Sequence, residues 1–260
     1  MIELFLPAFA VSVVLLGIHS YFGLEIIRRG IIFTDLAIGQ MAALGTAVAL
    51  LLFEGHFVYP VSLAFALLTG LLIGLLSRRE RNVEPLIGLL YALGLAGVFL
   101  LLSRSPHGVE EMQNLMAYDI LFTPLTAVGQ TAVLYAGIGL VLWLTRNLQG
   151  LARELIFFVC FAATVTSSVK LAGVLVVFAL LVAPALLAAY LPVRHKLATA
   201  WLLGTLVNLA AMALSFYADL PTGYTVVFAQ TLVALLAGLT AIACGRSLDP
   251  RAEPQTDSPG

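Results

Sequence analysis

Long apolar runs alternate with short polar segments along almost the whole chain. Most runs have about twenty residues, and at a rise of about 1.5 Å per residue a helix of this length crosses the roughly 30 Å hydrocarbon core of a bilayer. Charged residues gather between the runs, so the runs have no side that faces water. The pattern predicts membrane spans at about 4–24, 31–53, 57–76, 85–103, 124–144, 197–217 and 224–244, and one longer stretch at 154–191.

The stretch 154–191 is too long for one comfortable crossing and barely long enough for two. Its only polar interruption is Ser167-Ser168-Val169-Lys170, and a division there gives a short sixth helix and a seventh. On length alone, one crossing, two crossings, or one crossing plus a re-entrant piece all remain open. Two crossings bring the total to nine spans.

The basic residues test this division, because cytoplasmic loops of membrane proteins carry an excess of Lys and Arg. With the N-terminus outside, nine spans place eleven of the thirteen basic residues on the cytoplasmic side and leave Arg104 and Lys170 outside. The eleven are Arg28, Arg29, Arg78, Arg79, Arg81, Arg146, Arg153, Arg194, Lys196, Arg246 and Arg251. We therefore expect an extracytoplasmic N-terminus and a cytoplasmic C-terminus, and two passes or a re-entrant piece fit 154–191 better than one pass.

Composition agrees with an all-α, polytopic membrane bundle of eight or nine helices. Hydrophobic residues make up 61% of the chain and charged residues 10%, and the mean hydropathy is +1.05, far from soluble domains. Residues 1–246 are expected to form one transmembrane domain, and the proline-containing segment 247–260 a disordered cytoplasmic tail. The net charge of −1 gives no reason to expect a nucleic-acid partner. Cys160 and Cys244 lie in apolar runs and are expected to pack as small hydrophobic residues.

Motifs for catalysis are missing from the sequence. No Lys follows a Gly, so the chain has no phosphate-binding P-loop and is not expected to hydrolyse ATP by that route. It also lacks His-Glu-x-x-His and Gly-x-Ser-x-Gly. We expect a non-catalytic transport subunit that binds no cofactor, with small-residue faces in 31–53 and 85–103 that let helices pack closely.

Several short motifs, spread over nearly the whole length, have a recognisable combined pattern. They are Met1-Ile2-Glu3-Leu4, Arg28-Arg29, Gln40-Met41-Ala42-Ala43-Leu44-Gly45, Asn114-Leu115-Met116-Ala117-Tyr118, the block from Val169-Lys170-Leu171-Ala172-Gly173 to Pro184-Ala185, and Phe216-Tyr217-Ala218-Asp219-Leu220-Pro221-Thr222-Gly223. On these residues, the chain resembles the permease subunits of the manganese, zinc and iron ABC importers. The Lys-x-x-Gly to Pro-Ala block and the Pro-Thr-Gly turn are the most specific parts.

The resemblance implies partners and a location. Two permease copies, as a homodimer, would form the pathway in the bacterial inner membrane, two cytoplasmic ATPase subunits would bind beneath, and an extracytoplasmic metal-binding protein would deliver a zinc, manganese or iron ion. Pro184 is expected to interrupt the helix. The segment after it would be the coupling helix, and we expect 185–196 to be cytoplasmic and to make most of the ATPase contact. Its candidate contact residues are Pro184, Ala185, Leu187, Tyr190, Arg194 and Lys196.

The chain also departs from the family pattern. Relatives commonly carry Gly-Asp-x-apolar-small-His-Ala at the start of the second helix, whereas here Gln40 stands in place of the His and the acid, Asp35, lies one position early. A fourth-helix position that can be His appears as Tyr91. The candidate pathway residues are Asp35, Gln40, His19 and Tyr91, and Asp35 is the candidate metal ligand.

Each candidate has a structural alternative. Asp35 could cap the second helix or pair with Arg28 or Arg29, Gln40 could be an interhelical hydrogen-bonding residue, and His19 could be a satisfied core residue. At 100° per residue, Asp35 and Gln40 differ by about 140° and do not share a helix face. Partners for one ion would then come from other helices.

A second class of function also remains open, namely a self-sufficient secondary transporter or channel in which Asp35 takes up a proton or an ion. Such transporters often contain inverted repeats, and the two halves of this sequence show no convincing similarity, which favours the ABC permease. The sequence does not name the ion. Oxygen ligands such as Asp suit manganese, while imidazole suits zinc.

Overall fold

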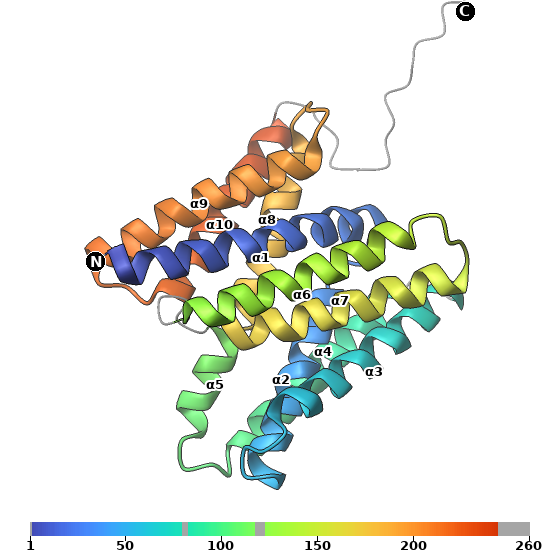
Figure 1. Ribbon diagram of the computed structural model, residues 1–260, viewed down its shortest axis with the longest axis vertical. Coiled ribbons are helices and arrows are strands. Elements are labelled where there is room, and N and C mark those ends of the chain that lie inside the picture. The colour runs from blue at the N-terminus through green and yellow to red at the C-terminus, as the bar shows by residue number, and fades with distance from the viewer. Residues whose placement is uncertain (1, 80–82, 118–122, 244–260) are drawn as a thin grey trace, which may run out of the picture.

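The fold is all-α (Figure 1), in a computed structural model that describes residues 2–79, 83–117 and 123–243. Cys244 and the predicted tail at 247–260 lie outside the described residues. Within them are ten helices: α1 (Ile2–Arg29), α2 (Thr34–Leu52), α3 (Val58–Arg79), α4 (Glu84–Leu102), α5 (Gly108–Met116), α6 (Leu125–Leu144), α7 (Leu151–Ala172), α8 (Val174–Tyr190), α9 (Lys196–Ala218) and α10 (Thr222–Ala243).

The helix lengths confirm the polytopic helical architecture. Eight of the described helices are long and apolar enough to cross a membrane, while α8, with 17 residues, is shorter. The helix α5 has nine residues and lies between the spans predicted at 85–103 and 124–144. Eight long spans plus α8 fall within the predicted range of eight or nine. Which ends face the cytoplasm stays a prediction.

Gly173 divides the ambiguous stretch into two helices, three residues beyond the predicted interruption. Its φ of 84° is a left-handed conformation that favours glycine. A Cβ here would lie 2.7 Å from the backbone N of Ala117 and 2.7 Å from the carbonyl O of Met116. The sequence therefore breaks the helix at the one position where the end of α5 also needs a residue without a side chain.

The expectation that Pro184 interrupts the helix is wrong. The helix α8 continues through Pro184 to Tyr190. Membrane helices tolerate proline because neighbouring helices and local adjustments satisfy the freed backbone groups, and here Pro184 is itself buried against Gly204 of α9, where a Cβ would lie 2.8 Å from its Cγ.

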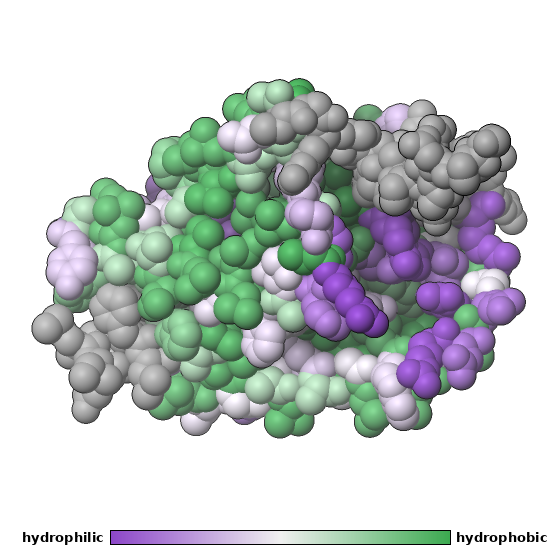
Figure 2. Space-filling model, turned by 90° about the horizontal axis from the view of Figure 1, so that it is seen from above, coloured by the Kyte–Doolittle hydropathy of each residue, from purple (hydrophilic) through white to green (hydrophobic). Residues whose placement is uncertain are grey.

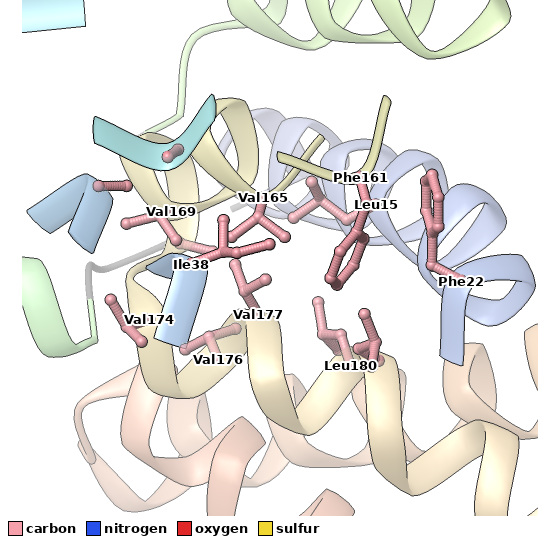
Figure 3. Close-up of a cluster of buried hydrophobic side chains, with 14 of the residues drawn as sticks. Leu15, Phe22, Ile38, Phe161, Val165, Val169, Val174, Val176, Val177 and Leu180 are labelled. Atoms are coloured by element: carbon pink, nitrogen blue, oxygen red, sulfur yellow. The ribbon is translucent and has the colours of Figure 1, made fainter. Parts of the chain in front are cut away.

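The buried centre of the molecule lies where α1, α2, α7 and α8 meet (Figure 3). Phe22 of α1 contacts Phe161 of α7 with ring centroids 4.9 Å apart, and Ile38 of α2 lies among valines of α7 and α8. Around this centre, α3 and α4 pack on α2, α6 and α9 pack on α1, and α10 packs on α8 and α9. Long apolar side chains of α4, α6, α9 and α10 remain exposed in the single chain, as expected for surfaces that face lipid or another subunit.

Arginines from three helices converge at one end of the bundle. Arg28 and Arg29 at the end of α1, Arg78 at the end of α3 and Arg153 at the start of α7 line one cavity. Figure 2 shows hydrophilic side chains gathered toward one end of the face that it presents, with hydrophobic side chains over most of the rest. The structure thus brings together four of the residues that the positive-inside rule assigns to one side.

Candidate functional site

Asp35 lies in the first turn of α2, where this helix begins inside the bundle. Its side chain is buried, and neither Asp35 Oδ1 nor Thr34 Oγ1 has a hydrogen-bond partner among the described residues. The start of α2 has no side-chain cap, and the carboxylate of Asp35 has an orphaned oxygen there.

The ion pairs near this helix start do not involve Asp35. Arg28 pairs with Glu25 at 2.5 Å, and Arg29 pairs with Glu25 at 3.0 Å and with Glu154 at 2.5 Å. The ion pairs among the described residues therefore do not include the predicted alternative of a pair between Asp35 and Arg28 or Arg29. A buried carboxylate without a partner is costly in a membrane interior, and such groups commonly mark ion or proton pathways.

Gln40 faces different neighbours from Asp35. Its Nε2 lies 3.7 Å from the Sδ of Met116 in α5, and its Oε1 has no partner among the described residues. On α4, Gly94 allows a close approach, because a Cβ there would lie 2.9 Å from the Cβ of Gln40. The adjacent Gly39 instead faces the α7–α8 junction, where its Cβ would lie 3.1 Å from Cγ1 of Val174. Since Asp35 is one turn before Gly39, the predicted separation of the Asp35 and Gln40 faces agrees with these contacts.

His19 lies at the centre of α1 and is fully buried. Its Nδ1 is 2.7 Å from the carbonyl oxygen of Leu15. A carbonyl only accepts, so Nδ1 carries the proton and Nε2 keeps its lone pair. This Nε2 has no partner among the described residues, and the ring lies edge-on to Tyr135 with centroids 6.3 Å apart. Among the described residues, His19 therefore has only one of its two ring nitrogens hydrogen-bonded, unlike the fully satisfied core histidine that was the structural alternative.

The four predicted pathway residues do not form one metal centre in a single chain. Among the described residues, no group of three or more His, Cys, Asp or Glu side chains is placed to hold a metal ion. Tyr91 is half-buried on α4 and packs against the hydrophobic core. Asp35, Gln40 and His19 instead share a different property, since each presents one buried polar atom without a hydrogen-bond partner.

Two buried polar networks were not predicted from the sequence. The hydroxyl of Tyr135 on α6 lies 2.5 Å from Ser168 Oγ and 3.1 Å from Ser167 Oγ on α7. On the other side of α1, Asn208 Nδ2 donates to Ser12 Oγ at 2.7 Å, and Gln230 Nε2 donates to Asn208 Oδ1 at 2.6 Å. The available signal was a polar side chain inside a long apolar run, although such a signal does not identify its partner.

The predicted coupling segment is more buried than expected. Ala185 has no exposed surface and Leu187 is 8% exposed, packed with Ala183 and Ala234. A Cβ on Gly23 of α1 would lie 2.9 Å from the Cβ of Ala185. This burial arises because α8 continues past Pro184 and its last turns pack against α1, α9 and α10. That residues 185–196 are cytoplasmic and contact the ATPase stays a prediction.

Lys196 has a structural partner at the end of the same helix. Its Nζ donates to the carbonyl oxygens of Ala188, Ala189 and Leu191 at 3.0, 3.1 and 2.6 Å, which satisfies acceptors that a helix C-terminus leaves open. Tyr190 is half-buried, whereas Leu191, Arg194 and His195 are exposed. The exposed part of the predicted coupling segment is thus the elbow 191–195 between α8 and α9.

The chain is similar in sequence to known transport proteins. Residues 144–241 match the model of the ABC 3 transport family. The "Probable iron transport system membrane protein" of Haemophilus influenzae is 26% identical over 258 residues, which cover 90% of this chain and 89% of that protein. The resemblance to permeases of metal ABC transporters, inferred above from sequence motifs, is confirmed by these matches.

Two solved structures share the fold. PsaBC from Streptococcus pneumoniae, solved in complex with a Fab, superposes with a TM-score of 0.73 at 16% identity and covers 90% of both chains. A metal-chelate type ABC transporter in an inward-facing conformation gives a TM-score of 0.65 at 18% identity, with coverage of 90% of this chain and 85% of that one. At these identities the two structures establish the helical arrangement alone.

Proposed function

We propose that this chain is the permease subunit of an ABC importer that moves a divalent metal cation into the cytoplasm. One observation carries the proposal: the only described acid buried in α2, Asp35, has an oxygen without a partner in a chain that is similar to metal ABC permeases. A divalent cation would supply the missing partner. It would also offset the cost of a carboxylate in the membrane interior.

Ligands for the ion come from more than one helix, and in this proposal from more than one copy of the chain. A divalent cation takes four to eight ligands, and the described residues of one chain assemble no such set. A homodimer doubles the available groups and brings a second Asp35, a second His19 and a second Gln40 to the pathway. Each contributes the unpartnered atom described above, that is, Oδ1, Nε2 and Oε1.

Energy and substrate reach the permease through partners. Since the sequence holds no P-loop, a separate ATPase supplies the driving force, and the exposed elbow 191–195 is its docking surface. An extracytoplasmic metal-binding protein delivers the ion to the opposite side. These roles place the chain in a bacterial inner membrane, with the C-terminus in the cytoplasm.

The proposal is tested by reconstituting the permease with its ATPase partner in liposomes and measuring uptake of manganese, zinc and iron. The expected result is ATP-dependent accumulation of at least one of these metals in the presence of the delivery protein. The matched control is an ATPase whose P-loop lysine has been replaced, with which uptake stops. Uptake by the permease alone, without ATP, would contradict the proposal and favour the secondary transporter.

A further inference from the structure

A second site candidate lies at the end of the bundle, in a cavity whose lining residues do not include Asp35. A cavity of about 570 Å³ opens between the ends of α1 and α3 and the start of α7. Four arginines and two glutamates are among its lining residues: Arg28, Arg29, Arg78, Arg153, Glu25 and Glu154. The balance of these side chains is therefore two positive charges.

The two glutamates already have cationic partners. Glu25 accepts from Arg28 and Arg29, and Glu154 accepts from Arg29. Arg78 and Arg153, in contrast, take part in no ion pair among the described residues. The cavity thus contains two guanidinium groups that pair with no carboxylate of the described residues, and a guanidinium matches the geometry of phosphate oxygens.

Neutral donors point to an anion as well. Ser77 Oγ lines the cavity, is fully buried, and has no hydrogen-bond partner among the described residues. Helix α7 begins beside it after Gly150, which has a φ of 71° and provides no side-chain cap. The first N–H groups of a helix lack intrahelical acceptors and attract anions. The cavity therefore combines charge, a free hydroxyl and a helix N-terminus in one place.

The surface that leads to the cavity is apolar. On α3, Leu68, Leu72 and Leu75 are 68%, 43% and 48% exposed. They repeat at intervals of four and three residues and so form one stripe along the helix. Arg78 follows three residues later on the same stripe and lines the cavity. An amphiphile could lie with its chain along the leucines and its polar head at Arg78.

From this arrangement we infer that the cavity binds the phosphate headgroup of an anionic phospholipid, with the acyl chain along the leucine stripe of α3. Basic pockets near the cytoplasmic ends of membrane helices have the charge and depth that such headgroups require. The phosphate would neutralise the charges of Arg78 and Arg153 and would accept a hydrogen bond from the hydroxyl of Ser77. Because α1, α3 and α7 all contribute, the bound lipid would hold the ends of three helices together.

The test uses the purified permease–ATPase complex in detergent, titrated with phosphatidylglycerol and, separately, with phosphatidylcholine of the same acyl chains. Binding is measured by native mass spectrometry and by the shift in thermal unfolding temperature. Phosphatidylglycerol is expected to bind and to raise the unfolding temperature, with phosphatidylcholine much weaker. The effect should fall with rising ionic strength, since exposed charges are screened by salt.

The double substitution Arg78→Gln with Arg153→Gln should weaken phosphatidylglycerol binding on the order of 30-fold, because each arginine near an anionic headgroup contributes roughly a fivefold factor. Arg104→Gln is the matched control, since Arg104 is exposed beyond the opposite end of α4 and does not line the cavity. The pair Arg78→Lys with Arg153→Lys keeps the charge and should recover much of the binding. If the double variant does not fold, Arg78→Gln alone should show the fivefold loss.

Three results would overturn the inference. Unchanged phosphatidylglycerol binding in the double glutamine variant would remove the site. Equal protection by millimolar inorganic phosphate in the absence of lipid would assign the cavity to a free anion. Loss of the ATPase from the complex, with unchanged lipid binding, would make these arginines a protein contact.

Discussion

The two sides of α1 contain buried polar groups that differ in how far they bond to one another. On the side of α9 and α10, Ser12, Asn208 and Gln230 form a chain of hydrogen bonds of 2.7 and 2.6 Å, and only Oε1 of Gln230 in this group has no partner among the described residues. Toward α2 and α6, Asp35 and His19 each keep an atom without a partner among the described residues. Both regions are equally buried, so burial does not distinguish them. The paired group holds helices together, whereas the unpaired groups are available to a ligand.

The substitution Asp35→Asn tests this difference between paired and unpaired groups most directly. The amide keeps the shape of the side chain but removes the charge, so metal uptake by the reconstituted transporter should fall by about 100-fold or more, as expected when an interaction with a charged substrate is lost from a buried site. The thermal unfolding temperature should stay the same or rise, because a neutral amide is easier to bury than an unpaired carboxylate.

Asp219→Asn is the matched control for that change. Asp219 ends α9 in a left-handed conformation with φ of 51° and is exposed. Asparagine tolerates this conformation well, so uptake should remain at the level of the unchanged protein. Full uptake by the Asp35→Asn variant would move the pathway away from α2 and leave helix capping as the role of Asp35.

The second prediction separates the buried from the exposed part of the coupling segment. Leu191→Asp puts a charge on the exposed elbow. The few residues that dominate an interface each contribute more than about 1 kcal/mol, so if Leu191 is one of them, stimulation of the ATPase by the permease should fall roughly tenfold. Leu187→Asp places a charge in the packed interface of α8 with α10 and should lower the yield of folded protein instead. The two are compared by ATPase activity of the complex and by size-exclusion profiles of the permease. Normal stimulation with Leu191→Asp would argue for another docking loop.

The third prediction concerns the paired network. Asn208→Ala removes the hydrogen bonds to Ser12 and from Gln230, and should cost about 1–2 kcal/mol of stability, the usual range for interhelical hydrogen bonds in membranes. Uptake per folded molecule should be nearly unchanged, since both hydrogen bonds of Asn208 are made to other side chains of the protein. Asn147→Ala, at an exposed position, gives the baseline. The comparison uses unfolding in detergent and uptake normalised to folded protein, and a selective loss of uptake would place Asn208 in the pathway.

The helices were predictable because they depend on a one-dimensional property, the length of apolar runs. The break near Lys170 was placed within three residues of Gly173 because the only polar interruption of 154–191 lies there. Partners across helices were not predictable. Tyr135 meets Ser168 only through the rotation of α6 and α7 about their axes, and helices that are apolar all round leave little periodic signal of that rotation.

Pro184 and the helix α5 show a different limit of prediction from sequence. A proline removes one hydrogen bond and clashes with the preceding turn in an isolated helix, which is why the sequence suggested an end to the helix there. In the bundle, α1 and α9 pack on α8 and the helix continues. Likewise, α5 has few residues and a polar face, so its helical form rests on contacts such as that of Met116 with Gln40.

The smallest expected effect is a change of metal preference by Gln40→His. The amide of Gln40 offers an oxygen without a partner, and oxygen donors suit manganese, whereas an imidazole nitrogen suits zinc. The substitution should therefore raise the ratio of zinc to manganese uptake by a few-fold with little loss of total transport, because Asp35 is unchanged. Gln113→His, exposed on α5, controls for an added surface histidine. Uptake of both metals is measured in competition in the same liposomes. An unaltered ratio in Gln40→His, with Asp35→Asn still inactive, would mean that the ion passes along the Asp35 face of α2 alone, and that the unpaired amide serves the contact with α4 and α5 rather than the choice of metal.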